Sequence, residues 1–307
     1  MICILYRKSS ISVAFQTNAI LRGCNLFIWY GFSDNHQQKD IIIDAAIIKD
    51  YLNEDLSRFD HSCISVDSAD DIVSCMLILG RIIYDDACKR NNFAQLIVEN
   101  EYGDYVVILD QRVVIHKRVI FSDQEACFTN TSNSLFSFLG SRPKHCMLSS
   151  ATNFTNKQLN ELLYASQNDK DVDITYIDEV TSTAITFTGS SLGRPSKFSV
   201  CCRAQYTHQI AGIPSSEKCS HLHGHTYKCC VCVFNSSDVA NTDSFMKAIG
   251  QSTVLALDEA FLLKYVQQTT VENVARYLAC KLSQSYKLAF VELAETSNIM
   301  ARITFDD

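Results

Sequence analysis

Apolar residues in the first third of the chain follow patterns that predict two strands and then two helices. Residues 2–15 and 20–32 are rich in Ile, Val and aromatic residues, and the polar run 16–19 separates them, so they predict a β-hairpin. Residues 44–56 and 67–84 predict amphipathic helices, the second with acidic residues in its first turn. The apolar stripe of the first helix would consist of Ile47, Ile48, Tyr51, Leu52 and Leu56.

The middle of the chain changes character several times. Residues 93–121 alternate apolar and polar positions over short segments, which predicts further hairpins. A helix is predicted over 154–165 and two short strands over 172–187. Residues 188–195 combine Gly, Ser and Pro, so we expect a linker there.

The C-terminal third repeats the order of strands followed by helices. Its patterns predict two long strands, two helices and a closing strand pair. The strands are expected over 198–206, 226–234, 288–293 and 299–305, and the helices over 239–250 and 270–282.

Composition excludes several classes of protein. The formal net charge of −7 argues against binding to nucleic acid or to an anionic membrane surface. No run approaches the roughly 18 apolar residues of a membrane span, and the first residues lack a secretory pattern. We therefore expect a cytoplasmic protein whose 14 cysteines are reduced thiols, including those of the segment Cys229-Cys230-Val231-Cys232, which would serve only packing.

One short segment carries the candidate chemistry. His223 and His225 are two residues apart at the start of a predicted strand, so both imidazoles would lie on one face. His208 ends another predicted strand eleven residues before Cys219, and an antiparallel return would bring it to the pair. Three protein ligands and an open position are typical of catalytic zinc, and Cys219 would be the nucleophile or base. The alternatives are a polar sheet face and an ordinary buried thiol.

These residues resemble a known signature. The run from Lys218-Cys219 through His223-Gly224-His225 to Tyr227, with His208 upstream, resembles the zinc and nucleophile signature of the 6-pyruvoyltetrahydropterin synthase family. This family includes the bacterial 6-carboxytetrahydropterin synthases of queuosine biosynthesis. Residues 269–275 resemble the start of the family's Thr-x-Glu-Asn helix, and Glu295-Thr296 resembles its pterin anchor. The similarity covers residues 196–307.

The resemblance implies a fold, a cofactor and a substrate. Members are T-fold proteins, whose antiparallel strands and paired helices assemble into oligomeric barrels. In them three histidines hold Zn²⁺, here His208, His223 and His225, beside a dihydropterin. Cys219 would move protons, assisted by an Asp-His pair. Glu295 would hold the pterin edge, and Thr270 is a lesser candidate for contact with the ring.

A degenerate first copy of this unit is predicted before the linker. Residues 22–25, 42–45 and 59–61 stand where family motifs would fall in such a copy. The expected architecture is therefore α+β, with tandem T-fold units of antiparallel sheets and helices packed on one face. Residues 1–192 would form the first half, with a β-rich insertion at about 93–146, and residues 196–307 would form the zinc-binding half.

One departure from the family concerns its catalytic Asp-His pair. The second half has Leu257-Asp258-Glu259 where the family has Leu-Asp-His, and the one Asp-His dipeptide is Asp60-His61. We therefore expect the first half to contribute Asp60 and His61 to catalysis. The alternative is that His61 is an ordinary surface or core histidine.

Two functions remain open at this point. The first is a zinc-dependent lyase that converts 7,8-dihydroneopterin triphosphate into 6-carboxytetrahydropterin or a 6-pyruvoyl product. The second is a catalytically weakened module that keeps zinc and pterin for a structural or regulatory role. In both cases the partner is a small pterin and the chain forms a homo-oligomer, a dimer or a higher ring.

Overall fold

The structure is a computed structural model, in which the chain forms two compact units. Unit 1 consists of residues 1–7, 31–48 and 197–307, and unit 2 consists of residues 8–30 and 49–196. The residues described are 1–18, 21–34, 43–66, 69, 71–109, 112–120, 145–150, 173–178, 183–187, 196–210, 212–216, 218–235, 242–257, 266 and 268–305.

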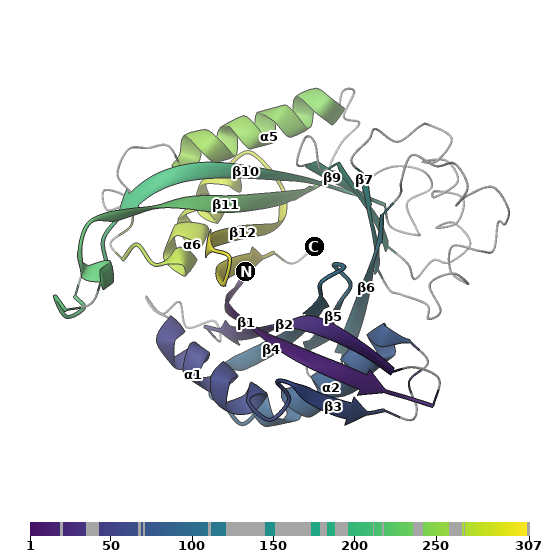
Figure 1. Cartoon of the computed structure of the whole chain (residues 1–307). Coiled ribbons are helices and arrows are strands. Elements are labelled where there is room, and N and C mark those ends of the chain that lie inside the picture. Colours follow the sequence, from purple (N-terminus) through teal and green to yellow (C-terminus); the bar gives the residue numbers. More distant parts are fainter. Residues whose placement is uncertain are drawn as a thin grey trace, which may run out of the picture. The chain divides into compact units, whose positions relative to one another are not determined.

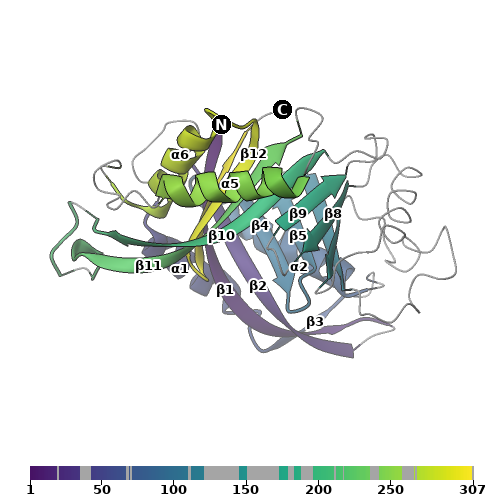
Figure 2. The ribbon, with the colours of Figure 1, turned by 90° about the horizontal axis from the view of Figure 1, so that it is seen from above.

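Unit 1 is an antiparallel sheet with two helices on one face. The strand order is β1-β13-β12-β11-β10, where β1 contributes its first residues. Helix α5 packs on β10, whereas α6 packs on β12 and β13 (Figure 1; Figure 2 shows α5 from above). The elements are β1 (Ile2–Gln16), β10 (Lys197–His208), β11 (His223–Phe234), α5 (Thr242–Leu257), α6 (Val271–Leu282), β12 (Leu288–Thr296) and β13 (Ile299–Thr304).

The core of unit 1 follows from the two-residue period of its strands. Alternate residues of β11, among them Tyr227, Cys229 and Val231, have no exposed surface. Phe198 of β10 meets Phe245 of α5 edge to face, with ring centroids 5.7 Å apart. The helices therefore cover one face of the sheet, and that face ends in the candidate site described below.

Unit 2 is a larger mixed sheet. Its strand order is β9-β8-β7-β6-β5-β4-β2-β1-β3, and the pairs β1–β3, β6–β7 and β7–β8 are parallel. Besides the rest of β1 the elements are β2 (Leu21–Ser33), α1 (Ala45–Leu56), β3 (Ser62–Ser65), α2 (Ile72–Ala87), β4 (Phe93–Asn100), β5 (Tyr105–Leu109), β6 (Arg112–Ile120), β7 (His145–Ser150), β8 (Asp173–Asp178) and β9 (Thr183–Phe187). The last residues of β2 and the first of α1 belong to unit 1.

Most of the predicted elements are confirmed. The strands predicted at the start of the chain are neighbours in the sheet, and the hairpins predicted after residue 93 are β4, β5 and β6. The helix predicted at 44–56 is α1, but Ile47 is 43% exposed because Ile48 and Leu52 already fill the buried face. Strand β7 was not predicted. The predicted helix at 154–165 and the predicted linker lie outside the described residues.

The start of α2 and the end of α5 differ most from the prediction. Helix α2 begins at Ile72 rather than at residue 67, because the Asp71 side chain accepts a hydrogen bond of 2.7 Å from the Ser74 N–H and caps the helix there. Helix α5 runs to Leu257, seven residues beyond the predicted end at Gly250. Gly250 is tolerated inside the helix, where its Cα faces Val200 of β10.

The predicted α+β class is confirmed, whereas the tandem arrangement and its domain boundaries stay a prediction. No helix among the described residues is long and apolar enough to cross a membrane.

The prediction that all cysteines are reduced thiols is wrong for one pair. Cys201 of β10 and Cys230 of β11 lie directly opposite each other, with 4.1 Å between their Cα atoms, and form a disulfide. Their register brings the two sulfur atoms together, which the spacing along the chain could not reveal. Disulfides are more typical of oxidising compartments than of the cytosol, so the cytoplasmic location stays a prediction.

We predict that replacing Gly31 with Ala destabilises unit 1. A Cβ at this position of β2 would lie 2.7 Å from Cε1 of Tyr6 and 2.9 Å from Cγ2 of Ile4, and the Tyr6 ring is only 1% exposed. The overpacked variant should lose about 1–3 kcal/mol of unfolding free energy, measured by urea denaturation.

The matched control is Gly23→Ala in the same strand. There a Cβ would meet nothing closer than the Val13 carbonyl oxygen at 3.9 Å, so stability should stay within about 0.5 kcal/mol of wild type. Equal stability of the two variants would contradict the packing described here.

Candidate functional site

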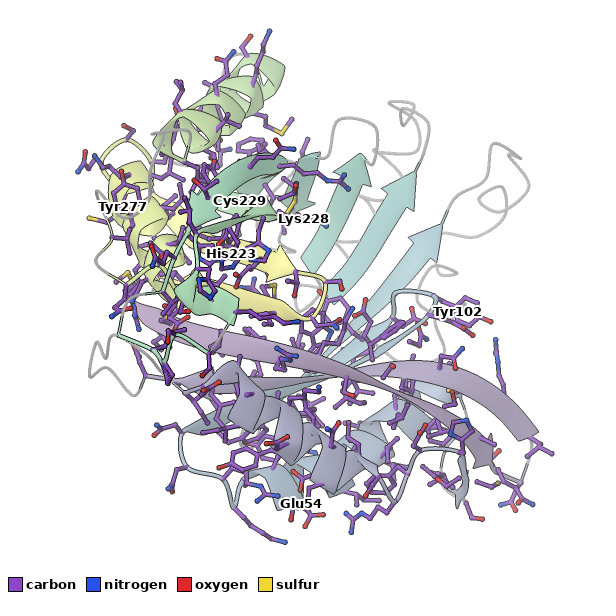
Figure 3. All side chains as sticks on the ribbon, turned by 60° about the vertical axis from the view of Figure 1, so that its left-hand side comes forward. Glu54, Tyr102, His223, Lys228, Cys229 and Tyr277 are labelled. Atoms are coloured by element: carbon purple, nitrogen blue, oxygen red, sulfur yellow. A yellow bond between two sulfur atoms is a disulfide. The ribbon has the colours of Figure 1, made fainter. Side chains whose placement is uncertain are left out.

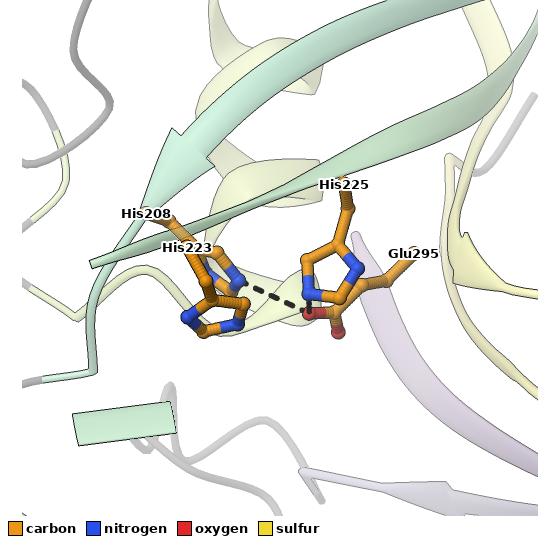
Figure 4. A group of neighbouring side chains, drawn as sticks. All are labelled: His208, His223, His225 and Glu295. Atoms are coloured by element: carbon orange, nitrogen blue, oxygen red, sulfur yellow. Dashed lines mark ion pairs between the residues drawn. The ribbon is translucent and has the colours of Figure 1, made fainter. Parts of the chain in front are cut away.

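Two paired strands bring three histidines together. In the antiparallel ladder of β10 and β11, His208 lies opposite His223, and Tyr206 lies opposite His225. Residues directly opposite each other share a face, as do residues two apart on one strand. The three imidazoles therefore project from the same face of the ladder and point toward one another (Figure 4).

The three histidines lie at the end of a buried row, which consists of alternate residues of β11 such as Tyr227, Cys229 and Val231. Tyr227, which has no exposed surface, stands between His225 and the apolar core on the same face of β11. Its ring centroid lies 6.1 Å from that of His208 and 5.9 Å from that of His225. Packed aromatic and apolar side chains thus support the imidazoles from the core side.

The ligand atoms of this group are close enough to share one ion. The ring centroids of His208, His223 and His225 are 4.4 to 5.1 Å apart. One nitrogen from each ring and one carboxylate oxygen of Glu295 all lie within 4.8 Å of one another. Among the described residues, these four side chains form the group whose spacing could hold a metal ion.

Glu295 reaches the histidines from the next strand. Lys228 of β11 is paired with Ala294 of β12, so Glu295 follows beside Tyr227. Its Oε1 lies 3.2 Å from Nε2 of His208 and 3.1 Å from Nε2 of His225. The sequence predicts Glu295 as a pterin anchor, and the structure also brings it to the imidazoles. Only the sheet order could have revealed this proximity.

Backbone carbonyls orient two of the rings. Nδ1 of His208 lies 2.9 Å from the Thr269 carbonyl oxygen, and Nδ1 of His223 lies 2.8 Å from that of His221. Each Nδ1–H donates to its carbonyl, which leaves the lone pair of Nε2 for another partner. Sequence reasoning missed these two carbonyls because no side-chain pattern marks them.

Thr269 is itself fixed against the end of β10. Its hydroxyl donates a hydrogen bond of 2.8 Å to the Gln209 carbonyl oxygen. The segment before α6, which carries the carbonyl that orients His208, is thereby held beside the last residues of β10. This contact ties two segments 60 residues apart in the sequence to one ring.

The protonation of the two innermost rings follows from burial and from Glu295. Burial lowers the pKa of His225, although the Glu295 carboxylate pulls in the opposite direction. In His208 burial also lowers the pKa, but it is outweighed by the interactions with Glu295 and Thr269, and the net shift is upward. The Glu295 carboxylate lies beside both rings, so a cation bound there would compete with protons for the imidazole nitrogens.

The residues fit a zinc ion. Three imidazole nitrogens, with or without a carboxylate oxygen, form a donor set typical of Zn²⁺. Nε2 of His208 is buried and has no hydrogen-bond partner among the described residues, since its approach to Glu295 lacks hydrogen-bond geometry. Such an atom is costly unless a ligand satisfies it. Gly224 lies between the two histidines of β11, where a Cβ would lie 3.2 Å from the Tyr206 carbonyl oxygen, a tight contact that glycine avoids.

Cys219 lies in a short 3-10 helix, Lys218–Ser220, and is half-buried. Its carbonyl accepts a hydrogen bond of 2.9 Å from the Ile210 N–H, which anchors this turn to the residues after β10. Burial raises the pKa of Tyr227, and electrostatic interactions with Glu295 and Cys219 raise it further. The thiol therefore lies within electrostatic range of the aromatic ring that adjoins the imidazoles.

Thr270 stands directly before α6 as its N-cap residue. Its side chain makes no capping hydrogen bond, and its buried Oγ1 has no hydrogen-bond partner among the described residues. The predicted contact of Thr270 with a pterin ring stays a prediction, but the hydroxyl is available for it.

The predicted Asp60–His61 pair is formed within unit 2. Nδ1 of His61 lies 3.1 Å from Oδ2 of Asp60, and Asp60 accepts a hydrogen bond of 2.9 Å from the Ser12 N–H. That bond is the main cause of the lowered pKa of Asp60. The His61 side chain is 82% exposed. Its part in catalysis stays a prediction, and Asp258 and Glu259 lie outside the described residues.

Comparisons with known proteins bear on the segment that contains this site. Residues 193–305 match the family model described as 6-pyruvoyl tetrahydropterin synthase. No curated protein matches the chain in sequence.

Three solved structures are similar to parts of the chain. The 6-pyruvoyl tetrahydropterin synthase of Caenorhabditis elegans is 19% identical with a TM-score of 0.30, over 36% of this chain and 95% of that one. An uncharacterized protein from Wolinella succinogenes is 16% identical with a TM-score of 0.23, over 36% and 99%. The uricase of Arthrobacter globiformis is 6% identical with a TM-score of 0.25, over 94% and 78%.

These TM-scores are too low to support an argument, so the assignment depends on the family model. The matched segment contains β10, β11, α5, α6, β12 and β13, and with them every residue of the imidazole cluster. In residues 193–305 the chain is therefore similar to the 6-pyruvoyl tetrahydropterin synthase family.

Proposed function

We propose that the chain is a zinc-dependent lyase of the tetrahydropterin synthase type, acting on 7,8-dihydroneopterin triphosphate. The convergence of His208, His223 and His225, in a segment that matches the family model, is the observation that carries this proposal. The product would be 6-carboxytetrahydropterin, as in queuosine biosynthesis, or a 6-pyruvoyl tetrahydropterin. A homo-oligomer and a cytoplasmic location belong to the same proposal.

The three histidines would hold the zinc ion, His208 and His223 through the Nε2 atoms that their Nδ1 hydrogen bonds leave available. A bound zinc ion supplies a Lewis acid, which lowers the cost of negative charge on the oxygens of the substrate side chain. The carbonyls of Thr269 and His221 keep the rings in the required tautomer. The buried row behind them excludes water from the core side.

Cys219 would act as the acid and base of the reaction. A thiolate beside a cation is stabilised, so Cys219 would take a proton from a side-chain carbon of the substrate and return it to the neighbouring carbon. Glu295 would accept hydrogen bonds from the N–H edge of the pterin, as a charged acceptor that fixes the orientation of the ring. Substrate would then replace the imidazoles as the partner of this carboxylate.

The second candidate function is a zinc- and pterin-binding module with weak or no turnover. The observation that favours it is the sequence Leu257-Asp258-Glu259, which lacks the family's histidine, together with the exposure of His61 on unit 2. A module of this kind would retain the imidazole cluster but lack a partner for Cys219.

The first prediction from this proposal concerns metal content. The purified chain should bind about one zinc ion, and His223→Ala should lower zinc affinity by more than about 100-fold, because losing a ligand costs more than losing a group that only hydrogen-bonds to a ligand. Metal analysis after dialysis measures both values. His221→Ala is the matched control, since only the backbone carbonyl of His221 is used, and it should retain zinc. Equal zinc loss in both variants would exclude the assigned ligands.

The second prediction separates the two roles open to Glu295. If the carboxylate holds the pterin, Glu295→Gln keeps its zinc while kcat/KM falls about 10- to 100-fold, the value of a charge-assisted hydrogen bond of about 1.5–3 kcal/mol. Zinc analysis and steady-state kinetics on the same sample measure both. Loss of zinc with an unchanged KM would show that Glu295 is a ligand instead.

The third prediction concerns proton transfer. Cys219→Ala should lower kcat on 7,8-dihydroneopterin triphosphate by about 10²–10⁴-fold with zinc content unchanged, the usual loss for a general acid or base. Cys280→Ala removes an exposed thiol of α6 and should leave kcat at the wild-type value.

His61→Ala belongs to the same series and tests the predicted part of the Asp60–His61 pair. A similar loss of kcat would support that part, and an unchanged kcat would exclude it while leaving Cys219 in place. Zinc and pterin binding without turnover in every sample, wild type included, would establish the binding module.

A further inference from the structure

A second chemical feature of β10 and β11 lies farther along the ladder from the histidines. Two consecutive pairs of opposite residues are cysteines: Cys201 faces Cys230, and Cys202 faces Cys229. The first pair is the disulfide described above, whereas the second consists of free thiols. Neither pair has a role in the proposed lyase.

The two pairs lie on opposite faces of the ladder. Successive side chains of a strand point to opposite faces, so the thiols Cys202 and Cys229 share the face of His208 and Tyr227, and the disulfide lies on the other. Figure 3 labels Cys229 and His223 on β11. Because the sheet separates them, the free thiols cannot exchange directly with the Cys201–Cys230 bond and form an independent pair.

The geometry of the free pair suits a disulfide. Opposite residues of an antiparallel ladder alternate between narrow and wide pairs, with Cα distances of about 4.5 Å and about 5.5 Å. Cys201 and Cys230, at 4.1 Å, are a narrow pair, so Cys202 and Cys229 fall on a wide one. A Cα distance of about 5.5 Å lies within the range of about 4.4–6.8 Å that disulfides span, so the separation expected for this pair permits the bond.

The two thiols are not equivalent. Cys202 is half-buried and can be reached from solvent, whereas Cys229 has no exposed surface. The thiol of Cys229 donates a hydrogen bond to the sulfur of Cys202, which lowers the pKa of Cys202 and raises the pKa of Cys229, and burial raises the latter further. Access and acidity both make Cys202 the attacking thiol and leave Cys229 to act second.

We propose that Cys202 and Cys229 form a thiol–disulfide exchange site for low-molecular-weight disulfides. The Cys202 thiolate attacks one sulfur of the small disulfide, forms a mixed disulfide and releases one small thiol. Cys229 gives its proton to the thiolate released in the first step and attacks the Cys202 sulfur, which forms the Cys202–Cys229 bond and releases the second small thiolate, protonated by solvent. The two cysteines are oxidised by two electrons, and the small disulfide is reduced to two thiols.

The new bond would add a covalent link to the strands that carry the histidines. Cys229 is four residues from His225 on the same face, with Tyr227 between them. Oxidation would therefore fix the register of β10 against β11 on the histidine face, as the existing disulfide does on the other. The proposal does not depend on zinc binding or on turnover.

The test uses the full chain and glutathione as the probe. After incubation with oxidised glutathione at graded ratios to the reduced form, remaining thiols are alkylated and peptides are mapped by mass spectrometry. Wild type should form the Cys202–Cys229 link. Cys229→Ala should instead accumulate glutathione on Cys202, at least about tenfold more than wild type, because the internal thiol that resolves the mixed disulfide is missing.

Two further thiols serve as internal controls in the same maps. Cys280 is a free, exposed thiol, so it should take up glutathione in every variant, whereas the buried Cys232 should stay unmodified. Circular dichroism checks that Cys229→Ala is folded, and the link in wild type requires no variant. The proposal is wrong if wild type forms no Cys202–Cys229 link while Cys280 is modified, or if Cys202 stays free of glutathione in Cys229→Ala.

Discussion

The hydrogen-bonded register of β10 against β11 is the constraint on which the site depends. It sets His208 opposite His223 and keeps His225 on the same face as both. A slip by one residue would turn His223 and His225 to the other face of the sheet and separate them from His208. The buried row behind the imidazoles opposes such a slip, because the slip would expose Tyr227, Cys229 and Val231. The same strand register therefore determines both the packing of unit 1 and the geometry of its candidate metal site.

Four segments that are distant in the sequence meet at this register. The end of β10 supplies His208, the start of β11 supplies two further rings, the residues before α6 supply the Thr269 carbonyl, and β12 supplies Glu295. Each contact restricts the conformation of a side chain in the site, so a ligand would have less conformational freedom to remove on binding. In the described part of the chain the buried Nε2 of His208 makes no hydrogen bond, although Oε1 of Glu295 lies 3.2 Å away, and a bound cation would satisfy it. The structure thus favours a cation at the point where the four segments converge.

Much of this could be predicted from sequence, and the limits have physical causes. The spacing of His223 and His225 shows a shared face directly, and an antiparallel return places His208, because both inferences need only the period of a strand. Glu295 could not be placed beside the rings without knowing that β12 neighbours β11. The disulfide was missed for a similar reason, since the pairing of Cys201 with Cys230 depends on register to the residue. The early start predicted for α2 reflects a choice among several acidic residues, of which Asp71 forms the cap.

The measurement that tests the central claim most directly is X-ray absorption spectroscopy at the zinc edge of the metal-loaded chain. The account predicts nitrogen and oxygen ligands alone, at about 2.0–2.2 Å, with the multiple scattering of imidazole rings. The spectrum should change when His208 is replaced by Ala and should stay the same when Cys219 is replaced by Ala. A sulfur shell at about 2.3 Å, or a zinc spectrum indifferent to His208, would contradict it.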